Sequence, residues 1–153
     1  MRNVTVAAIQ MQCAKDVETN IQTAERLVRQ AAKQGAKIIL LPELFERPYF
    51  CQERQYDYYQ YAQSVSENTA IQHFKGIAKE LKVVLPISFY EKDGNVLYNS
   101  IAVIDADGEV LGVYRKTHIP DDHYYQEKFF FTPGNTGFKV WDTRYAKIGI
   151  GIC

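Results

Sequence analysis

The sequence predicts an α/β fold built on a mixed β-sheet. Short apolar runs at 4–11 and 38–41 have the pattern of buried strands, and they alternate with two stretches of helical periodicity. Later apolar runs are separated by turns that contain Asp-Gly, which favour antiparallel hairpins. The 153 residues contain no repeat, low-complexity tract or linker, so we expect one domain over 1–153.

The first half of the chain predicts strand, helix, strand and helix in that order. After the first strand, residues 16–34 place apolar side chains at helical spacing, and Gly35 follows as a C-cap. Pro42 stops the second strand, and an aromatic-rich segment expected to serve packing comes after it. Asn68 is expected to cap the second helix. The alternation predicts helices packed on a sheet.

The second half predicts three antiparallel strands, a long loop and a final strand. The three strands are expected at 83–90, 96–105 and 109–114. Residues 117–137 form a polar and aromatic loop, and loops of this length are often functional. The run from Ala146 to Cys153 alternates β-branched residues with glycines, which predicts a buried strand whose glycines allow close approach of backbone or substrate.

Composition excludes several classes of partner. Eighteen basic residues balance eighteen acidic ones, so we expect no binding to nucleic acid or to a membrane. The N-terminal residues lack the features of a signal peptide, which favours a cytoplasmic location where the three cysteines stay reduced. His118, His123 and the neighbouring acidic residues match no usual zinc spacing, so no metal is expected. A phosphate-binding glycine motif is also lacking.

Three chemically active side chains stand at the ends of predicted strands: Glu43, Lys116 and Cys153. If these strands run the same way, the three groups share one crevice at the carboxyl edge of the sheet. A carboxylate can take a thiol proton and an ammonium can stabilise an oxyanion, as nucleophilic attack by cysteine requires. Taken singly, each residue also has an ordinary structural interpretation. Glu43 suits a solvated loop charge, Lys116 part of a basic corner of the surface, and Cys153 a small buried hydrophobic residue.

Three ordered segments resemble the motifs of the nitrilase superfamily of carbon-nitrogen hydrolases. They are Pro42-Glu43-Leu44-Phe45, Tyr114-Arg115-Lys116-Thr117-His118 and Ile148-Gly149-Ile150-Gly151-Ile152-Cys153. The resemblance implies a four-layer α-β-β-α sandwich, of which this chain holds about the first half, in a homo-oligomer. It also implies that Glu43 is the general base, Lys116 the oxyanion-stabilising amine and Cys153 the nucleophile, while Glu127 positions the lysine and touches the substrate.

Within that superfamily, residues 43–52, 125–129 and 133–140 are most similar to the branch that hydrolyses N-carbamoylputrescine. The resemblance implies hydrolysis to putrescine, carbon dioxide and ammonia through a carbamoyl thioester on cysteine, without a cofactor. The distal ammonium of such a substrate needs an acidic or aromatic receptor. Five residues are candidates for this role: Tyr49, Asp121, Asp122, Tyr124 and Tyr125.

Other interpretations remain open at this point. Other branches of the superfamily, such as β-ureidopropionases, aliphatic amidases and nitrilases, share the triad, and a non-catalytic binding module could keep the fold. Members of the superfamily are nearly twice as long as this chain, so we expect the protein to continue beyond Cys153. A carboxyl terminus at that residue would place a negative charge beside the thiol and disfavour the thiolate.

Overall fold

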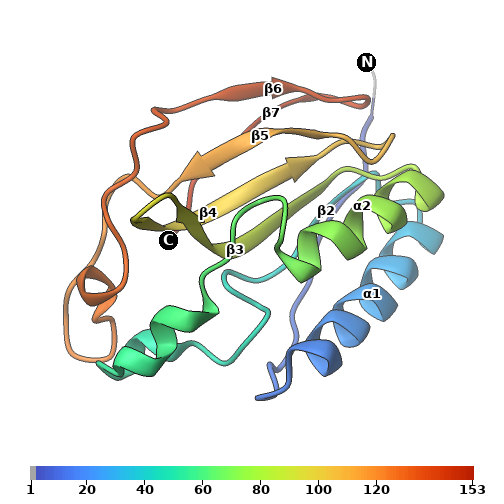
Figure 1. The fold of residues 1–153 in the computed structure, drawn as a ribbon. Helices are drawn as coiled ribbons and strands as arrows, with labels where there is room; N and C mark the ends of the chain where they lie inside the picture. The colour runs from blue at the N-terminus through green and yellow to red at the C-terminus, as the bar shows by residue number, and fades with distance from the viewer. Residues whose placement is uncertain (1–2) are drawn as a thin grey trace.

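The computed structural model describes residues 3–153 and packs two helices against one face of a β-sheet (Figure 1). Its elements are, in order, β1 (Val6–Ala8), α1 (Val17–Lys33), β2 (Ile38–Leu40), η1 (Phe50–Gln52), η2 (Tyr56–Tyr61), α2 (Thr69–Leu81), β3 (Leu85–Asp93), β4 (Val96–Ile104), β5 (Val110–Arg115), η3 (Glu127–Phe129), β6 (Val140–Asp142) and β7 (Lys147–Gly149), where η marks a 3₁₀ helix. This confirms the α/β class. No helix in residues 3–153 combines the length and apolar character needed to cross a membrane.

Side-chain caps fix where the two helices begin. The Asp16 carboxylate accepts a hydrogen bond from the Thr19 N–H at 2.8 Å. The C-cap of α1 is Gln34, one residue before the predicted Gly35, which follows it with a φ of +95°. At the start of α2, the Asn68 side chain accepts a hydrogen bond from the Ile71 N–H at 2.8 Å. The predicted cap at Asn68 is confirmed.

The sheet is mixed, as predicted, and its strand directions bring two strand ends together. β1 and β2 are parallel, and Ile38 forms a parallel bridge with Val84 just before β3. β3, β4 and β5 then pair antiparallel in sequence order. Because two hairpins reverse the chain twice, β5 runs in the same direction as β2 and β3. The carboxyl ends of β2 and β5 therefore lie at the same edge of the sheet.

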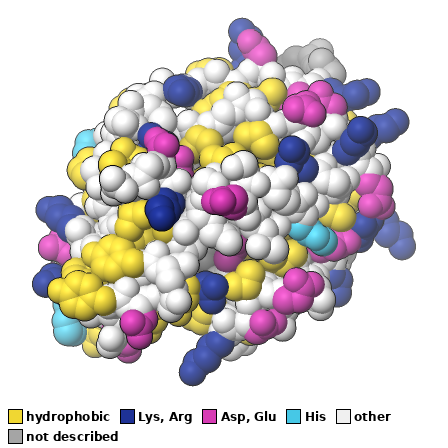
Figure 2. Space-filling view, viewed as in Figure 1, with side chains coloured by type: hydrophobic (Ala, Val, Ile, Leu, Met, Phe, Trp, Pro, Cys, Tyr) yellow, Lys and Arg dark blue, Asp and Glu magenta, His cyan; other side chains and the backbone are white. Residues whose placement is uncertain are grey.

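Two hydrophobic clusters support this arrangement. The larger one lies between the helices and the sheet, where Val28 of α1 and Phe74 of α2 are fully buried. The second joins the aromatic segment after β2 to the long loop, with the Phe50 and Phe130 rings in a T-shaped contact at 5.1 Å between centroids. The aromatic segment thus serves packing, as predicted. On the face in Figure 2, acidic and basic side chains are interspersed, with no large patch of one sign.

The prediction of a buried strand at 146–153 is wrong. Only Lys147–Gly149 forms a strand, β7, and it pairs solely with β6 among the described residues. Ile148, Ile150 and Ile152 are half-buried against a small cluster around Trp141, while the residues between them are exposed. Within residues 3–153 this segment is covered on one face only, which gives the alternation. Within residues 3–153, no atom approaches within 4 Å of a Cβ placed at Gly151.

Candidate active site

Glu43 is presented by a strained turn at the end of β2. The next residue, Leu44, has a φ of +52°, a left-handed conformation that is unfavourable for a bulky side chain. Its N–H donates to the buried Ser88 hydroxyl of β3 at 2.9 Å, which secures the turn. Pro42 follows the strand as predicted, and the turn places the Glu43 carboxylate against Lys116, which follows β5.

Lys116 follows β5, and both its backbone N–H and its carbonyl oxygen are hydrogen-bonded. Its N–H donates to the Asn99 carbonyl oxygen at 2.8 Å, and its carbonyl oxygen accepts from the Gly134 N–H at 2.8 Å. The side chain is 2% exposed, and Nζ donates to Glu43 Oε1 at 3.0 Å and to Glu127 Oε2 at 2.8 Å. The expected meeting of the β2 and β5 ends is therefore observed, and Glu127 joins them.

The two carboxylates keep Lys116 charged in spite of its burial. Burial alone would lower the pKa of this ammonium, but the hydrogen bond to Glu127 and the negative charge of Glu43 outweigh that effect, and the pKa lies above its usual value. Glu127 is nearly as buried, at 3% side-chain exposure, whereas Glu43 is 30% exposed. Glu43 is therefore the more accessible carboxylate of the pair.

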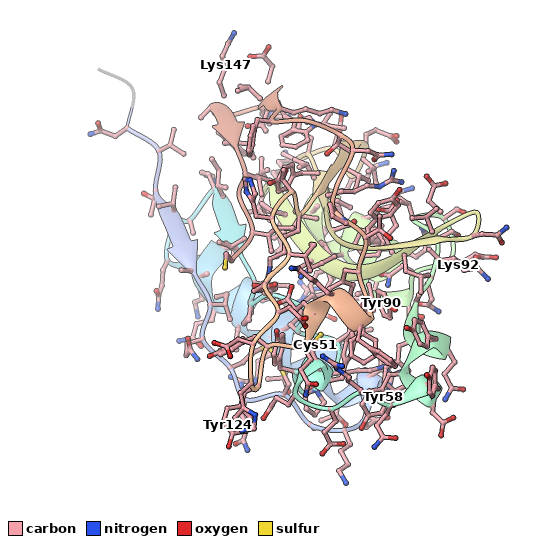
Figure 3. All side chains as sticks on the ribbon, turned by 90° about the vertical axis from the view of Figure 1, so that its left-hand side faces the viewer. Cys51, Tyr58, Tyr90, Lys92, Tyr124 and Lys147 are labelled. Carbon is pink, nitrogen blue, oxygen red and sulfur yellow. The ribbon has the colours of Figure 1, made fainter. Side chains whose placement is uncertain are left out.

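Tyr49 holds the far side of Glu127. Its hydroxyl donates to Glu127 Oε1 at 2.6 Å, and burial together with this hydrogen bond raises the pKa of the phenol well above its usual range. The neighbouring backbone is also joined, because the Gln126 N–H donates to the Cys51 carbonyl oxygen at 2.9 Å. Figure 3 looks onto this side of the molecule, with the labelled Cys51 near the centre beside η3. Sequence reasoning proposed Tyr49 as a substrate contact and did not foresee its bond to Glu127.

Asn99 is a site residue that sequence reasoning missed. It lies on β4, is fully buried, and its Nδ2 donates to Glu43 Oε1 at 2.6 Å. The available signal was a polar Asn-Ser pair inside the otherwise apolar run that forms β4. Buried polar side chains in a strand interior require hydrogen-bond partners, so such a pair indicates a specific contact with another part of the chain.

A pocket of about 440 Å³ brings the predicted catalytic residues together. Its lining consists of Glu43, Tyr49, Lys116, Pro120, Tyr125, Glu127 and Cys153. The Cys153 side chain is exposed and unpaired. A thiol, a partly exposed carboxylate and a cation thus line one cavity, the combination that attack on a carbonyl or nitrile carbon requires. The Tyr49 and Tyr125 rings stand 6.0 Å apart between centroids in its wall.

Three of the proposed ammonium receptors lie elsewhere. Asp121 and Asp122 line a separate depression of about 210 Å³, where an Asp121 oxygen is 3.9 Å from a nitrogen of Arg54. Tyr124 is 60% exposed with its ring against His123, and Figure 3 shows it at the lower edge of the molecule. Of the five candidates, Tyr49 and Tyr125 are the ones at the pocket with the triad. Within residues 3–153, no cluster of metal-ligating side chains forms here or elsewhere.

The sequence model of the carbon-nitrogen hydrolase family matches residues 5–153, which is nearly the whole chain. The chain belongs to the carbon-nitrogen hydrolase family. It is 56% identical to an N-carbamoylputrescine amidase of Solanum tuberosum over 99% of this chain and 51% of that protein. It is also 50% identical to a citrullinase of Francisella tularensis over 100% of this chain and 54% of the relative.

The fold agrees with this assignment. A crystal structure of a carbon-nitrogen hydrolase from Helicobacter pylori superposes with a TM-score of 0.90 at 32% identity, covering 98% of this chain and 51% of that one. The chain therefore spans about half the length of the relatives that it matches. The helix layer and the sheet layer described above are the part of the family fold that these residues supply.

Proposed function

We propose that the protein is an amidohydrolase that cleaves the ureido group of N-carbamoylputrescine. The observation that carries the proposal is the single pocket lined by Glu43, Lys116, Glu127 and Cys153. The 56% identity to a plant N-carbamoylputrescine amidase supports the choice of substrate.

In the first half of the proposed reaction, the Cys153 sulfur attacks the ureido carbon while Glu43 accepts the thiol proton. The carbonyl oxygen becomes an oxyanion, and the Lys116 ammonium stabilises its charge. When the bond to the terminal nitrogen breaks, Glu43 returns the proton and ammonia leaves. A carbamoyl thioester remains on the cysteine.

In the second half, water attacks the thioester carbon and Glu43 accepts its proton. The bond to sulfur breaks, the thiol recovers the proton, and a carbamate leaves and decomposes to carbon dioxide and putrescine. In this scheme Glu127 has no proton to transfer. Its hydrogen bonds to Lys116 and Tyr49 support a role in holding the lysine at the reacting carbon.

The charges of the pocket favour a substrate that carries an ammonium group. Glu43 and Glu127 outnumber the one cation in the lining, Lys116, and both are hydrogen-bonded to it. The tilted rings of Tyr49 and Tyr125 offer aromatic faces, which attract ammonium groups. We therefore assign these two tyrosines, rather than Asp121, to the distal end of the substrate.

Citrulline is a second candidate substrate because of the 50% identity to a citrullinase. It also carries a ureido group, but its other end bears a carboxylate beside the ammonium. The lining of the described pocket holds one cation, Lys116, which is engaged by two carboxylates. This favours N-carbamoylputrescine over citrulline.

The test is a panel of substrates assayed by ammonia release with the full natural protein. N-Carbamoylputrescine, L-citrulline and N-carbamoyl-β-alanine are compared by kcat/KM, and we expect the first to be preferred. Cys153→Ala should abolish turnover. Activity of Cys153→Ala equal to that of the natural protein would contradict the proposal. A higher kcat/KM for L-citrulline or for N-carbamoyl-β-alanine would also contradict it.

A cytoplasmic location, assembly into a homo-oligomer and independence from cofactors remain predictions. Gel filtration of the full natural protein tests the assembly. Turnover after exhaustive treatment with a chelator tests the independence from metal ions.

A further inference from the structure

Asn99 contacts both charged partners of the site at once. Its backbone oxygen accepts the Lys116 N–H at 2.8 Å, and its side-chain Nδ2 donates to Glu43 Oε1 at 2.6 Å. β4 lies beside β5, and Glu43 reaches it from the end of β2, which is 56 residues away in sequence. One residue of the central antiparallel strand therefore fixes how the two strand ends face each other.

The orientation of the Asn99 amide is determined by Glu43. Turning the amide over would set its oxygen against Oε1 of the carboxylate, placing two acceptors in contact. In the observed orientation, Asn99 Oδ1 is the one buried side-chain oxygen or nitrogen without a hydrogen-bond partner within residues 3–153. An unpaired buried acceptor lowers stability. The orientation that leaves Asn99 Oδ1 unpaired is thus the one in which Nδ2 donates to Glu43.

The two oxygens of Glu43 are consequently different. Oε1 accepts hydrogen bonds from Asn99 and Lys116, at 2.6 and 3.0 Å. Oε2 has no hydrogen bond to any residue in 3–153, and the side chain is 30% exposed at a pocket that Cys153 also lines. Oε2 is therefore the oxygen that is open to exchange a proton.

We propose that Asn99 is a positioning residue that clamps Glu43 through Oε1 and so directs Oε2 toward the nucleophile and the attacking water. The inference rests on the proposed role of Glu43 as general base. Without the clamp the carboxylate rotates about its side-chain bonds, and both proton transfers lose their geometry. Substrate affinity does not depend on the clamp, because Asn99 is absent from the pocket lining.

The test uses Asn99→Leu in the full natural protein, with Ser100→Ala as the control. Leucine has the same number and branching of side-chain heavy atoms as asparagine, so this variant removes the hydrogen-bond donor and the unpaired acceptor together with the smallest change of side-chain shape. Ser100 is the next residue on β4, is fully buried, and donates from Oγ to the Glu91 carboxylate at the same 2.6 Å. The alternation of strand side chains turns it to the other face of the sheet.

We expect Asn99→Leu to lower kcat by about tenfold to a hundredfold, the range for loss of one hydrogen bond to a charged group, with KM within about twofold. Its resistance to denaturant should be unchanged or higher. Ser100→Ala should show the reverse, with reduced resistance and normal kcat. A merely structural Asn99 would lower stability without this fall in kcat, and that result would overturn the proposal. So would loss of the folded state in Asn99→Leu.

A substrate-independent measurement separates this inference from the proposed function. Alkylation of Cys153 by iodoacetamide, followed by mass spectrometry, should be slower by about threefold or more in Asn99→Leu than in the natural protein, because the thiol loses an oriented base. If N-carbamoylputrescine is not turned over, the proposed substrate fails, and this alkylation ratio still decides the role of Asn99. Equal alkylation rates would refute it.

Discussion

Replacement of Glu127 by glutamine tests whether the buried ion cluster is as tightly coupled as its geometry indicates. The substitution keeps the size of the side chain and removes its charge. Lys116 would keep Glu43 as its charged partner, at 3.0 Å, while its Nζ remains buried. The variant therefore isolates the contribution of one carboxylate to an ammonium whose side chain is 2% exposed.

The expected loss is large because both partners are almost fully buried. Lys116 and Glu127 are 2% and 3% exposed, and removing one member of such a pair typically costs about 3 to 5 kcal/mol. Since Glu43 still compensates part of the charge, we expect a loss near the lower end, about 3 kcal/mol of unfolding free energy. A fall in activity should accompany it, because the lysine is no longer held from the side of η3.

The pH dependence of stability provides a second signature. The pKa of Lys116 lies above its usual value of 10.5, so its charge favours folding at lower pH, and this contribution is lost as the pH rises through the folded-state pKa. Without the Glu127 charge, burial has less opposition and the folded-state pKa falls. The alkaline loss of stability should therefore be smaller, and should end at a lower pH, in Glu127→Gln than in the natural protein.

Denaturant unfolding of the full natural protein measures both effects. A matched control is Asp142→Asn, because Asp142 pairs with Lys147 at 3.4 Å between two side chains that are each more than 70% exposed, and its loss should leave stability unchanged within error. The double variant Lys116→Met/Glu127→Leu should recover stability relative to Glu127→Gln and remain inactive. If Glu127→Gln behaved like Asp142→Asn, the reasoning would be refuted.

Two further substitutions probe contacts around the cluster, and a third, in α2, serves as a control. Tyr49→Phe removes the donor to Glu127 and should lower kcat several-fold and unfolding stability by about 1 to 2 kcal/mol, as seen by kinetics and denaturation; unchanged values for both would show that the hydroxyl is dispensable. Gly134→Ala would drive a Cβ into the Arg115 carbonyl oxygen and should lower the free energy of unfolding by about 2 kcal/mol or more. Gly76→Ala in α2, where the space is open, should raise it by about 0.5 to 1 kcal/mol. Similar effects of the two substitutions in denaturant unfolding would contradict this expectation.

The edge at which the site forms was predictable from local patterns. Pro42 ends an apolar run, so Glu43 had to follow a strand, and two Asp-Gly turns imply two chain reversals before Lys116. The helix between β2 and β3 favours a parallel pair, and two reversals then return β5 to the direction of β3 and β2, which places the ends of β2 and β5 together. This inference needs only the order of the elements and no knowledge of side-chain contacts.

The partners around those residues were not predictable in the same way. The Tyr49 hydroxyl reaches Glu127 across 78 positions, and its direction depends on how the aromatic cluster folds the long loop. Asp121 looked suited to bind an ammonium but lies near Arg54 instead. The contact of Asn99 could not be predicted because it depends on the carboxylate of Glu43, which follows a different strand. Local periodicity reports which face a residue occupies, but not which distant group shares that face.

The wide spacing of the site residues along the chain also makes the site dependent on the pairing of distant strands. Glu43 and Lys116 are 73 positions apart, so they meet only when β2, β3, β4 and β5 are all in place. Pairing of strands that are far apart in the sequence is slow compared with forming a helix from local contacts. A partly folded chain in which these strands have not paired therefore holds Glu43 and Lys116 without the contact that the proposed site requires.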